Sequence, residues 1–151
     1  MTTACTARAD PDTLFGEAGH DKLKGEEGRD KQDGGEDSDY LYGGPGQDLL
    51  EGGADDDWVT GEGQPDTING GGGDDALEGG NGDDVISGGK GDDHCTGGDG
   101  ADELYGNAGG DKLVVGDDDV ARTGGDEGDA KEHEEAEEKV ETGAEAAVDK
   151  L

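Results

Sequence analysis

The chain has few of the residues from which an ordinary protein core is built. Only 26% of its 151 residues are hydrophobic, and 3% are aromatic. It carries 11 Lys and Arg residues against 43 Asp and Glu residues, so its formal net charge is −32. Low apolar content combined with high net charge is typical of chains that cannot bury enough surface to fold unaided. The composition therefore argues against a conventional hydrophobic core.

Other absences exclude whole classes of protein. No apolar run approaches the length of a membrane-spanning helix, so we expect no membrane insertion. The start of the chain, MTTACTARADPDTLFG, lacks the apolar segment of a cleaved signal peptide. The two cysteines, Cys5 and Cys95, do not indicate a disulfide framework. No nucleophile elbow, zinc-protease motif or phosphate-binding loop occurs, so we expect no enzymatic activity.

Glycine, in contrast, is abundant and recurs at a fixed spacing. With Gly16 as position 1 of a nine-residue unit, glycine occupies position 1 of eleven consecutive units. Position 6 is aspartate in all eleven, and position 8 is apolar in all but one, where Gln32 stands. A half-unit with Asp12 and Leu14 precedes them in phase. The position-6 residues are Asp12, Asp21, Asp30, Asp39, Asp48, Asp57, Asp66, Asp75, Asp84, Asp93, Asp102 and Asp111.

This pattern predicts a stacked solenoid. Positions 1 to 6 should turn, and positions 7 to 9 should form a short strand whose position-8 residue points inward. Two units make one coil, and stacked coils bury the position-8 residues between two parallel sheets. Collagen would need glycine at every third residue, and a disordered linker would not keep an apolar residue at position 8. The fold class is therefore all-β, and we expect positive φ at Asp37 and Asp55 of position 4.

The carboxylates need a counter-ion in such a stack. Each position-6 aspartate would lie close to the one a coil further on, so each column of like charges opposes folding. The partner must be cationic, because the net charge of −32 repels nucleic acid and anionic membranes. Calcium takes six to eight oxygen ligands in flexible geometry, whereas magnesium is stricter and zinc prefers His and Cys. The ligand chemistry favours several Ca²⁺ ions.

The segments GGNGDDVIS (79–87) and GGKGDDHCT (88–96) resemble the GGxGxDxUx repeat of RTX (repeats-in-toxin) proteins. The resemblance implies a right-handed parallel β-roll with Ca²⁺ held between turns that are one coil apart. It also implies that glycine carbonyls share each ion with the position-6 aspartates. Four turns keep glycine at positions 1, 2 and 4: Gly70, Gly71, Gly73, Gly79, Gly80, Gly82, Gly88, Gly89, Gly91, Gly97, Gly98 and Gly100.

Two units depart from the repeat. Unit 25–33 has Glu26 at position 2 and Gln32 at position 8, and unit 61–69 carries Glu62, Gln64 and Pro65. We expect calcium sites that involve these units to be weak, and loading to spread outward from the regular centre.

The pattern divides the chain into four parts. Residues 1–11 form an N-terminal extension, and residues 12–114 form the calcium-binding roll. The pattern predicts a degenerate repeat or cap over residues 115–132, in which Asp129 again falls at position 6. Residues 133–151 read as an acidic tail or a short weak helix, for which the resemblance also implies an export signal of the type I route.

The function expected from these features is calcium binding coupled to folding. Extracellular calcium modules work at about 10⁻⁴ to 10⁻³ M, so we expect a secreted or cell-surface monomer. An alternative is a calcium-rigidified adhesion or glycan-binding module with an exposed aromatic face of Tyr40, Tyr42 and Trp58. A disordered acidic calcium buffer that never rolls up is a third possibility.

Overall fold

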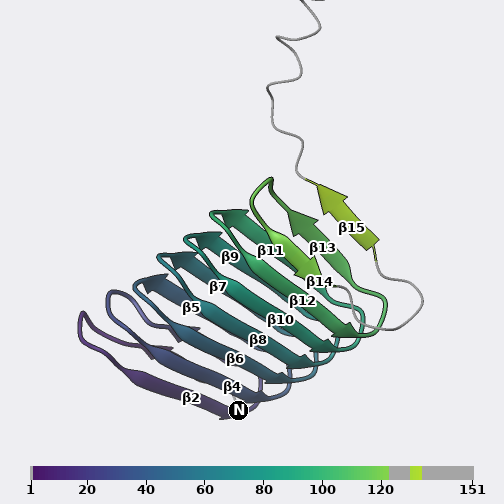
Figure 1. Ribbon diagram of the computed structural model, residues 1–151. Helices are drawn as coiled ribbons and strands as arrows, with labels where there is room; N and C mark the ends of the chain where they lie inside the picture. The colour runs from purple at the N-terminus through teal and green to yellow at the C-terminus, as the bar shows by residue number, and fades with distance from the viewer. Residues whose placement is uncertain (1, 123–129, 134–151) are drawn as a thin grey trace, which may run out of the picture.

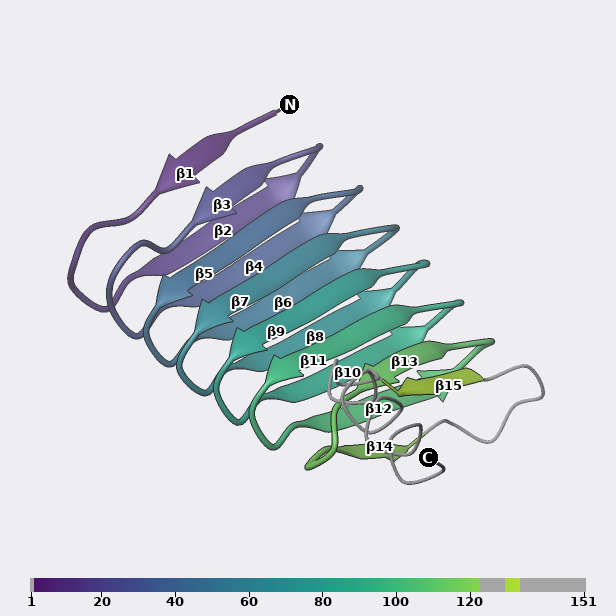
Figure 2. The ribbon, with the colours of Figure 1, turned by 90° about the horizontal axis from the view of Figure 1, so that it is seen from above.

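The computed structural model describes residues 2–122 and 130–133 and forms a parallel β-solenoid. Fifteen strands of the described residues alternate between two sheets, and neighbouring strands in each sheet pair in parallel (Figures 1 and 2). Strands of one sheet pair with a register of 18 residues, as Ile86 with Ile68 and with Leu104. The predicted fold class is confirmed. The predicted helical or frayed tail of residues 133–151 lies, apart from His133, outside the described residues.

The two sheets contain alternate strands of the chain. One sheet runs β1 (Ala4–Thr6), β3 (Lys22–Lys24), β5 (Tyr40–Pro45), β7 (Trp58–Gly63), β9 (Ala76–Asn81), β11 (His94–Asp99), β13 (Lys112–Val115) and β15 (Ala130–His133). The other runs β14 (Val120–Arg122), β12 (Glu103–Ala108), β10 (Val85–Lys90), β8 (Thr67–Gly72), β6 (Leu49–Ala54), β4 (Lys31–Glu36) and β2 (Thr13–Ala18).

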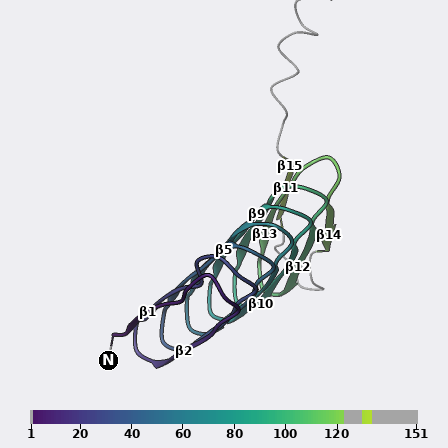
Figure 3. The ribbon, with the colours of Figure 1, turned by 90° about the vertical axis from the view of Figure 1, so that its left-hand side faces the viewer.

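A single column of side chains from each sheet makes the core. The position-8 residues from Leu14 to Leu113 are buried between the sheets, and Cys95 and Gln32 take their places in the same columns. Viewed more nearly along the stack, the coils follow one another as narrow ovals (Figure 3). Because each coil buries only two such side chains, it depends on its neighbours for stability.

The strands are longer than the sequence pattern predicts. Most of them continue from position 7 through positions 1 to 3 of the next unit, as Val85–Lys90 does. Position 1 is also buried, because it lies two residues after position 8 on the same inward face. The tight turn is therefore confined to positions 4 to 6.

Left-handed backbone occurs at two positions of the unit. The expected positive φ at position 4 is confirmed for Asp37 (73°) and Asp55 (71°). Position 2 is also left-handed, as at Gly89 with φ 122°. A Cβ on Gly89 would lie 2.2 Å from the carbonyl oxygen of Gly71 in the preceding coil, so a side chain there would force the backbone to shift. Glu62 and Asn107 nevertheless occupy position 2 of other units with positive φ.

Strand pairing extends beyond the regular units at both ends. In β1, Cys5 pairs with Leu23 and so stands at position 8 of an additional N-terminal half-coil. At the other end, β14 and β15 continue the two sheets, and Lys112 pairs with Ala130 in the 18-residue register. The domain limits of 12 and 114 remain a prediction.

Candidate calcium sites in the turns

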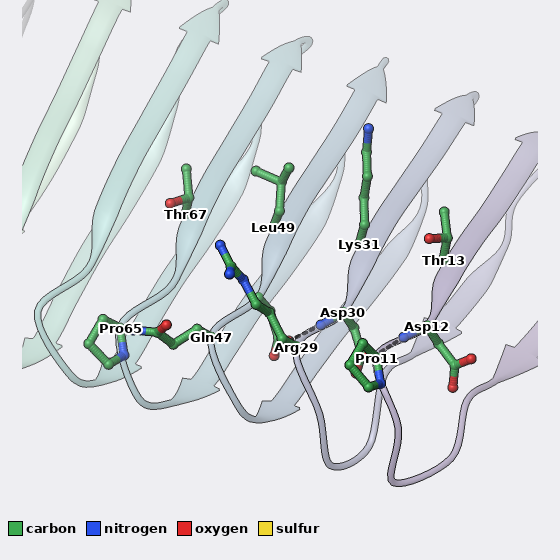
Figure 4. Close-up of a pocket in the computed structure, with 11 residues that line it drawn as sticks. Pro11, Asp12, Thr13, Arg29, Asp30, Lys31, Gln47, Leu49, Pro65 and Thr67 are labelled. Atoms are coloured by element: carbon green, nitrogen blue, oxygen red, sulfur yellow. Dashed lines mark hydrogen bonds between the residues drawn. The ribbon is translucent and has the colours of Figure 1, made fainter.

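Position-6 aspartates form two ladders, one along each edge of the roll. The backbone N–H of each aspartate donates to Oδ1 of the aspartate one coil further on, as Asp57 does to Asp75 at 2.8 Å. Figure 4 shows two rungs, from Asp12 to Asp30 and from Asp30 toward the next coil. Ten such bonds of 2.7 to 3.0 Å link the residues from Asp12 to Asp111. One carboxylate oxygen of each rung is therefore committed to holding the stack.

The second carboxylate oxygen is buried without a hydrogen bond. Oδ2 has no partner among the described residues in the aspartates Asp21, Asp30, Asp39, Asp48, Asp57, Asp66, Asp75, Asp84, Asp93 and Asp102. These side chains are at most 4% exposed. Burying a carboxylate oxygen without a partner costs free energy. A regular series of such atoms indicates positions for a cation.

Each of these oxygen atoms faces a space that glycine leaves open. A Cβ built on Gly79 would lie 2.3 Å from Oδ2 of Asp84 and 2.6 Å from the carbonyl oxygen of Gly97. The same pair of oxygens, from the unit's own aspartate and from position 1 of the next coil, borders Gly52, Gly61 and Gly70. We call this space beside position 1 the cradle. It is bordered by a carboxylate and a carbonyl, which are ligands that calcium prefers.

Burial raises the pKa of the ladder carboxyls from Asp30 to Asp102 in the metal-free chain. The pKa of Asp66 rises to about 8, and that of Asp57 to about 7. Desolvation is the main cause, and the neighbouring aspartates of the same ladder add to it. The hydrogen bond from the backbone of the preceding rung lowers the pKa but does not compensate. The site is therefore costly to ionise until positive charge enters it.

The arrangement restricts which ligands a cation could have. Among the described residues, no three His, Cys, Asp or Glu side chains converge as a metal site. An ion in the turns would have to draw most of its ligands from backbone carbonyls in addition to the aspartates. Calcium accepts mixed carbonyl and carboxylate ligands in flexible geometry. The residues present fit calcium.

The ends of the ladders differ from the middle. Asp12 donates to Asp30 like the others, but its own Oδ2 accepts from the backbone N–H of Arg8 at 3.0 Å. At the C-terminal end, Asp102 donates to Asp119 at 2.9 Å over 17 residues instead of 18. The sequence analysis missed Asp119, because a one-residue deletion moves it out of phase. The Asp-Asp-Asp run before Val120 was the available signal.

The structure also shows outer rungs at position 5. Asp74 donates its N–H to Oδ1 of Asp56, and Asp92 donates to Asp74, each at 2.8 Å. Asp83 similarly accepts from Ala101 at 3.0 Å. These side chains are exposed, and their bonds run in the opposite direction to those of the buried ladder. These hydrogen bonds link neighbouring turns on the outer surface of the roll.

In the four regular units, the position-2 glycines lie in the strands and not in the turn that the sequence predicted, whereas the position-4 glycines lie in the tight turns. A Cβ on Gly91 would lie 2.0 Å from the carbonyl oxygen of Gly73 in the preceding coil. These glycines therefore allow close contact between turns. Their role as carbonyl ligands remains a prediction.

Tyr40, Tyr42 and Trp58 lie on the outer face of the sheet that contains β5 and β7. Tyr40 and Trp58 are direct cross-strand partners with ring centroids 5.8 Å apart, and both are about half exposed. Lys22 lies over the ring of Tyr42 at 5.0 Å from its centroid. The expected placement of Tyr40 beside Trp58 is thus present, whereas their use as a partner face stays a prediction.

An open groove of about 460 Å³ runs beside one edge of the roll (Figure 4). Arg29, Lys31 and Leu49 are among the residues that line it.

The described residues contain no helix long and apolar enough to span a membrane.

Comparison with known families agrees with this geometry. Five segments match the RTX calcium-binding nonapeptide repeat: residues 6–31, 33–68, 60–95, 88–120 and 96–129. Among curated proteins the chain has no match. The matched segments cover most of the chain, and they include the position-6 ladders, the glycine cradles and the parallel coils described above. The chain therefore belongs to the family of RTX calcium-binding nonapeptide repeats.

Proposed function

We propose that this protein is a calcium-dependent folding module whose position-6 aspartates and glycine carbonyls hold several Ca²⁺ ions between stacked turns. The observation that carries the proposal is the series of buried, unpartnered Oδ2 atoms that face the glycine cradles. When bound, calcium would supply the positive charge that these carboxylates lack. No catalytic role is proposed.

The protein's own residues would prepare each site and couple it to folding. The Oδ1 hydrogen bonds orient the aspartates, and glycine at position 1 keeps the cradle open. Because ligands from two coils meet only in the stacked chain, binding free energy becomes folding free energy. Without calcium, the repulsion along the ladders and the small core should leave the chain largely unfolded.

The setting we propose is outside the cell or at its surface. Extracellular calcium modules work at about 10⁻⁴ to 10⁻³ M, so the same chain would stay open where free calcium is scarce. RTX repeat proteins are typically secreted by type I systems. This supports secretion by that route for the present chain as well. A chain of this kind would fold on reaching calcium outside, and we propose that it does so as a monomer.

The first test is a calcium titration followed by far-UV circular dichroism, with magnesium as the control. We expect a cooperative change from coil to β structure with Ca²⁺ and none with Mg²⁺. A chain that binds metal without gaining β structure would instead be a disordered buffer. A chain that stays coil at 10⁻² M Ca²⁺, above the range of extracellular modules, would contradict the proposal.

A pair of neutralising substitutions tests the sites themselves. Asp84 is buried in the ladder, whereas the adjacent Asp83 is exposed at position 5. We expect Asp84→Asn to raise the calcium midpoint at least several-fold, because an ion loses a carboxylate ligand. Asp83→Asn removes the same charge and should leave the midpoint nearly unchanged. Equal effects of the two substitutions would show that only overall charge matters.

The exposed pair of Tyr40 and Trp58 supports a second candidate function, contact with a glycan or a protein. Exposed stacked aromatic rings commonly serve such contacts, although cross-strand aromatic pairs also stabilise sheets without a partner. Trp58 fluorescence, measured with oligosaccharides after calcium is added, would test this candidate. If no oligosaccharide changes the fluorescence spectrum, the pair does not bind these glycans and only its structural role in the sheet is supported.

A further inference from the structure

Gln32 is the polar exception in the core. It occupies position 8 of unit 25–33, in strand β4, and pairs in parallel register with Leu14 of β2 and Leu50 of β6. Its side chain is fully buried, at 0% exposure. The other ten complete units carry an apolar residue at this position. An amide here must either find polar partners or cost stability.

The amide of Gln32 is only half satisfied. Its Nε2 donates to the carbonyl oxygen of Tyr42 at 2.6 Å, across the roll. Its Oε1 has no hydrogen-bond partner among the described residues, although it is buried. The carbonyl of Tyr42 already accepts from the backbone N–H of Gly25 at 2.9 Å. That carbonyl therefore does not depend on Gln32 for a partner.

The same amide reaches a calcium cradle. A Cβ on Gly25 would lie 2.5 Å from Oδ2 of Asp30 and 2.5 Å from the carbonyl oxygen of Gly43. The third atom beside this point is Nε2 of Gln32, at 2.9 Å. In the adjacent cradles, at Gly34 and Gly43, no atom of a position-8 side chain is among the three nearest. The cradle of Gly25 thus has a side chain that its neighbours lack.

We propose that Gln32 supplies its amide oxygen as an extra, inward-facing ligand to the calcium ion held at the Gly25 cradle. This inference rests on the calcium sites proposed above. Rotation about the terminal side-chain bond exchanges the oxygen and nitrogen ends of the amide, so Oε1 can take the place of Nε2 beside the cradle. Oε1 would then face the carbonyl oxygen of Tyr42, and the positive charge of the ion is what would make this contact between two acceptor oxygens favourable. A neutral amide oxygen is a normal calcium ligand. It would add a ligand without adding to the negative charge of the ladder.

The proposal reverses the expectation that Gln32 weakens its unit. Glu26 at position 2 of this unit pairs with Lys24 at 2.8 Å. Asp30 also lies near the N-terminal end of its ladder, where fewer coils support it. An additional ligand at this point would strengthen a site that is otherwise among the least supported.

If Gln32 is merely a defect in the core and not a calcium ligand, its replacement should have the opposite effect. One substitution therefore distinguishes these two explanations. Gln32→Met keeps the length of the side chain and removes the amide. If Gln32 were only a defect, methionine would stabilise the protein at every calcium concentration. If it is a ligand, the substitution should remove one bound ion, or weaken one ion at least tenfold, in isothermal titration of the full chain with CaCl₂.

Leu50→Met is the matched control, because Leu50 occupies the same column one coil further on. It should leave the number of bound ions unchanged. Gln32→Glu, which keeps an oxygen at the same place, should retain the ion that Gln32→Met loses. Unchanged calcium stoichiometry and affinities in Gln32→Met would overturn the inference.

A measurement on the unsubstituted protein gives an independent readout. At partial calcium loading, once the roll has folded, the side-chain ¹⁵N and ¹³C resonances of Gln32 should shift further as the remaining ions bind, beyond the shifts of Gln47 and Gln64, which lie outside the core columns. If Gln32 shifts no more than these two glutamines in a chain that binds calcium, the inference fails while the calcium sites stand. If the unsubstituted chain binds no calcium, the proposed function itself fails.

Discussion

At the scale of single residues, glycine at position 1 decides whether a turn can hold an ion. The Cβ of an alanine at Gly79 would lie within 2.6 Å of both oxygen atoms that border the cradle. Gly72, at position 3, has no heavy atom within 4 Å of such a Cβ and does not have a positive φ. The two glycines therefore offer the same chemical change with different consequences.

We expect Gly79→Ala to lose the ion of that turn, because its methyl group fills the cradle and displaces Asp84. Gly72→Ala should be neutral or slightly stabilising, by up to about 1 kcal/mol, because it reduces the entropy of the unfolded chain. Calcium stoichiometry and urea unfolding at saturating calcium measure both effects. Equal calcium stoichiometry in the two variants would show that the cradle is not where calcium sits.

Much of the residue-level pattern was available from the sequence. The exact recurrence of aspartate at position 6 and of an apolar residue at position 8 predicted the ladders and the core columns, including the burial of Cys95. That burial raises the pKa of the Cys95 thiol to about 12. The contact of Gln32 with the Gly25 cradle could not be predicted, because it depends on the distance across the roll. Asp119 was missed because recurrence is lost after a single deletion.

At the scale of strands, the sequence predicted which residues face inward but not how long each strand is. Glycines at positions 1 and 2 were read as part of the turn. In the structure, backbone bonds between coils continue through these positions, as in the pairing of Gly89 with Gly71. Glycine has low strand propensity, so local preference could not reveal strands that exist because neighbouring coils supply hydrogen bonds.

The cross-strand pair of Tyr40 and Trp58 should stabilise the sheet that contains β5 and β7. Their rings are tilted by 52° at a centroid distance of 5.8 Å, within the range of favourable aromatic pairs. We expect a double-mutant cycle with Tyr40→Ala and Trp58→Ala to give a coupling of about 1 kcal/mol in calcium-saturated protein. Urea unfolding measures it.

The matched control combines Trp58→Ala with Tyr105→Ala. Tyr105 lies in β12 of the other sheet, and Arg122 lies over its ring at 5.6 Å from the centroid. The effects of these two substitutions should add. Additive effects in the Tyr40 and Trp58 cycle as well would show that the pair contributes nothing as a pair.

At the scale of the whole molecule, stability arises from charge and stacking together. The core contains little more than one column of side chains from each sheet, while the formal net charge is −32. Each coil is stabilised only by its contacts with the coils next to it, as in other solenoids. The ladders concentrate the charge in rows that are buried beside the core. Neutralisation by protons and neutralisation by calcium should therefore compete for the same oxygen atoms.

This competition predicts opposite pH dependences with and without calcium. In the metal-free roll, the pKa values of Asp57 and Asp66 are about 7 and about 8, raised mainly by burial from an ordinary value of 3.8. Between about pH 4 and pH 8 the folded chain thus binds protons that the unfolded chain has released. The free energy of unfolding of the metal-free roll should fall as pH rises through this window.

Calcium, in contrast, requires the ionised carboxylates, so its apparent affinity should fall as pH decreases below about 7. We expect more β structure by circular dichroism in metal-free protein at pH 4.5 than at pH 8. We also expect the calcium midpoint to lie several-fold higher at pH 5.5 than at pH 8. A midpoint that does not change with pH would mean that the buried ladder carboxylates do not bind the ion, because ligands with raised pKa values must release protons as calcium enters.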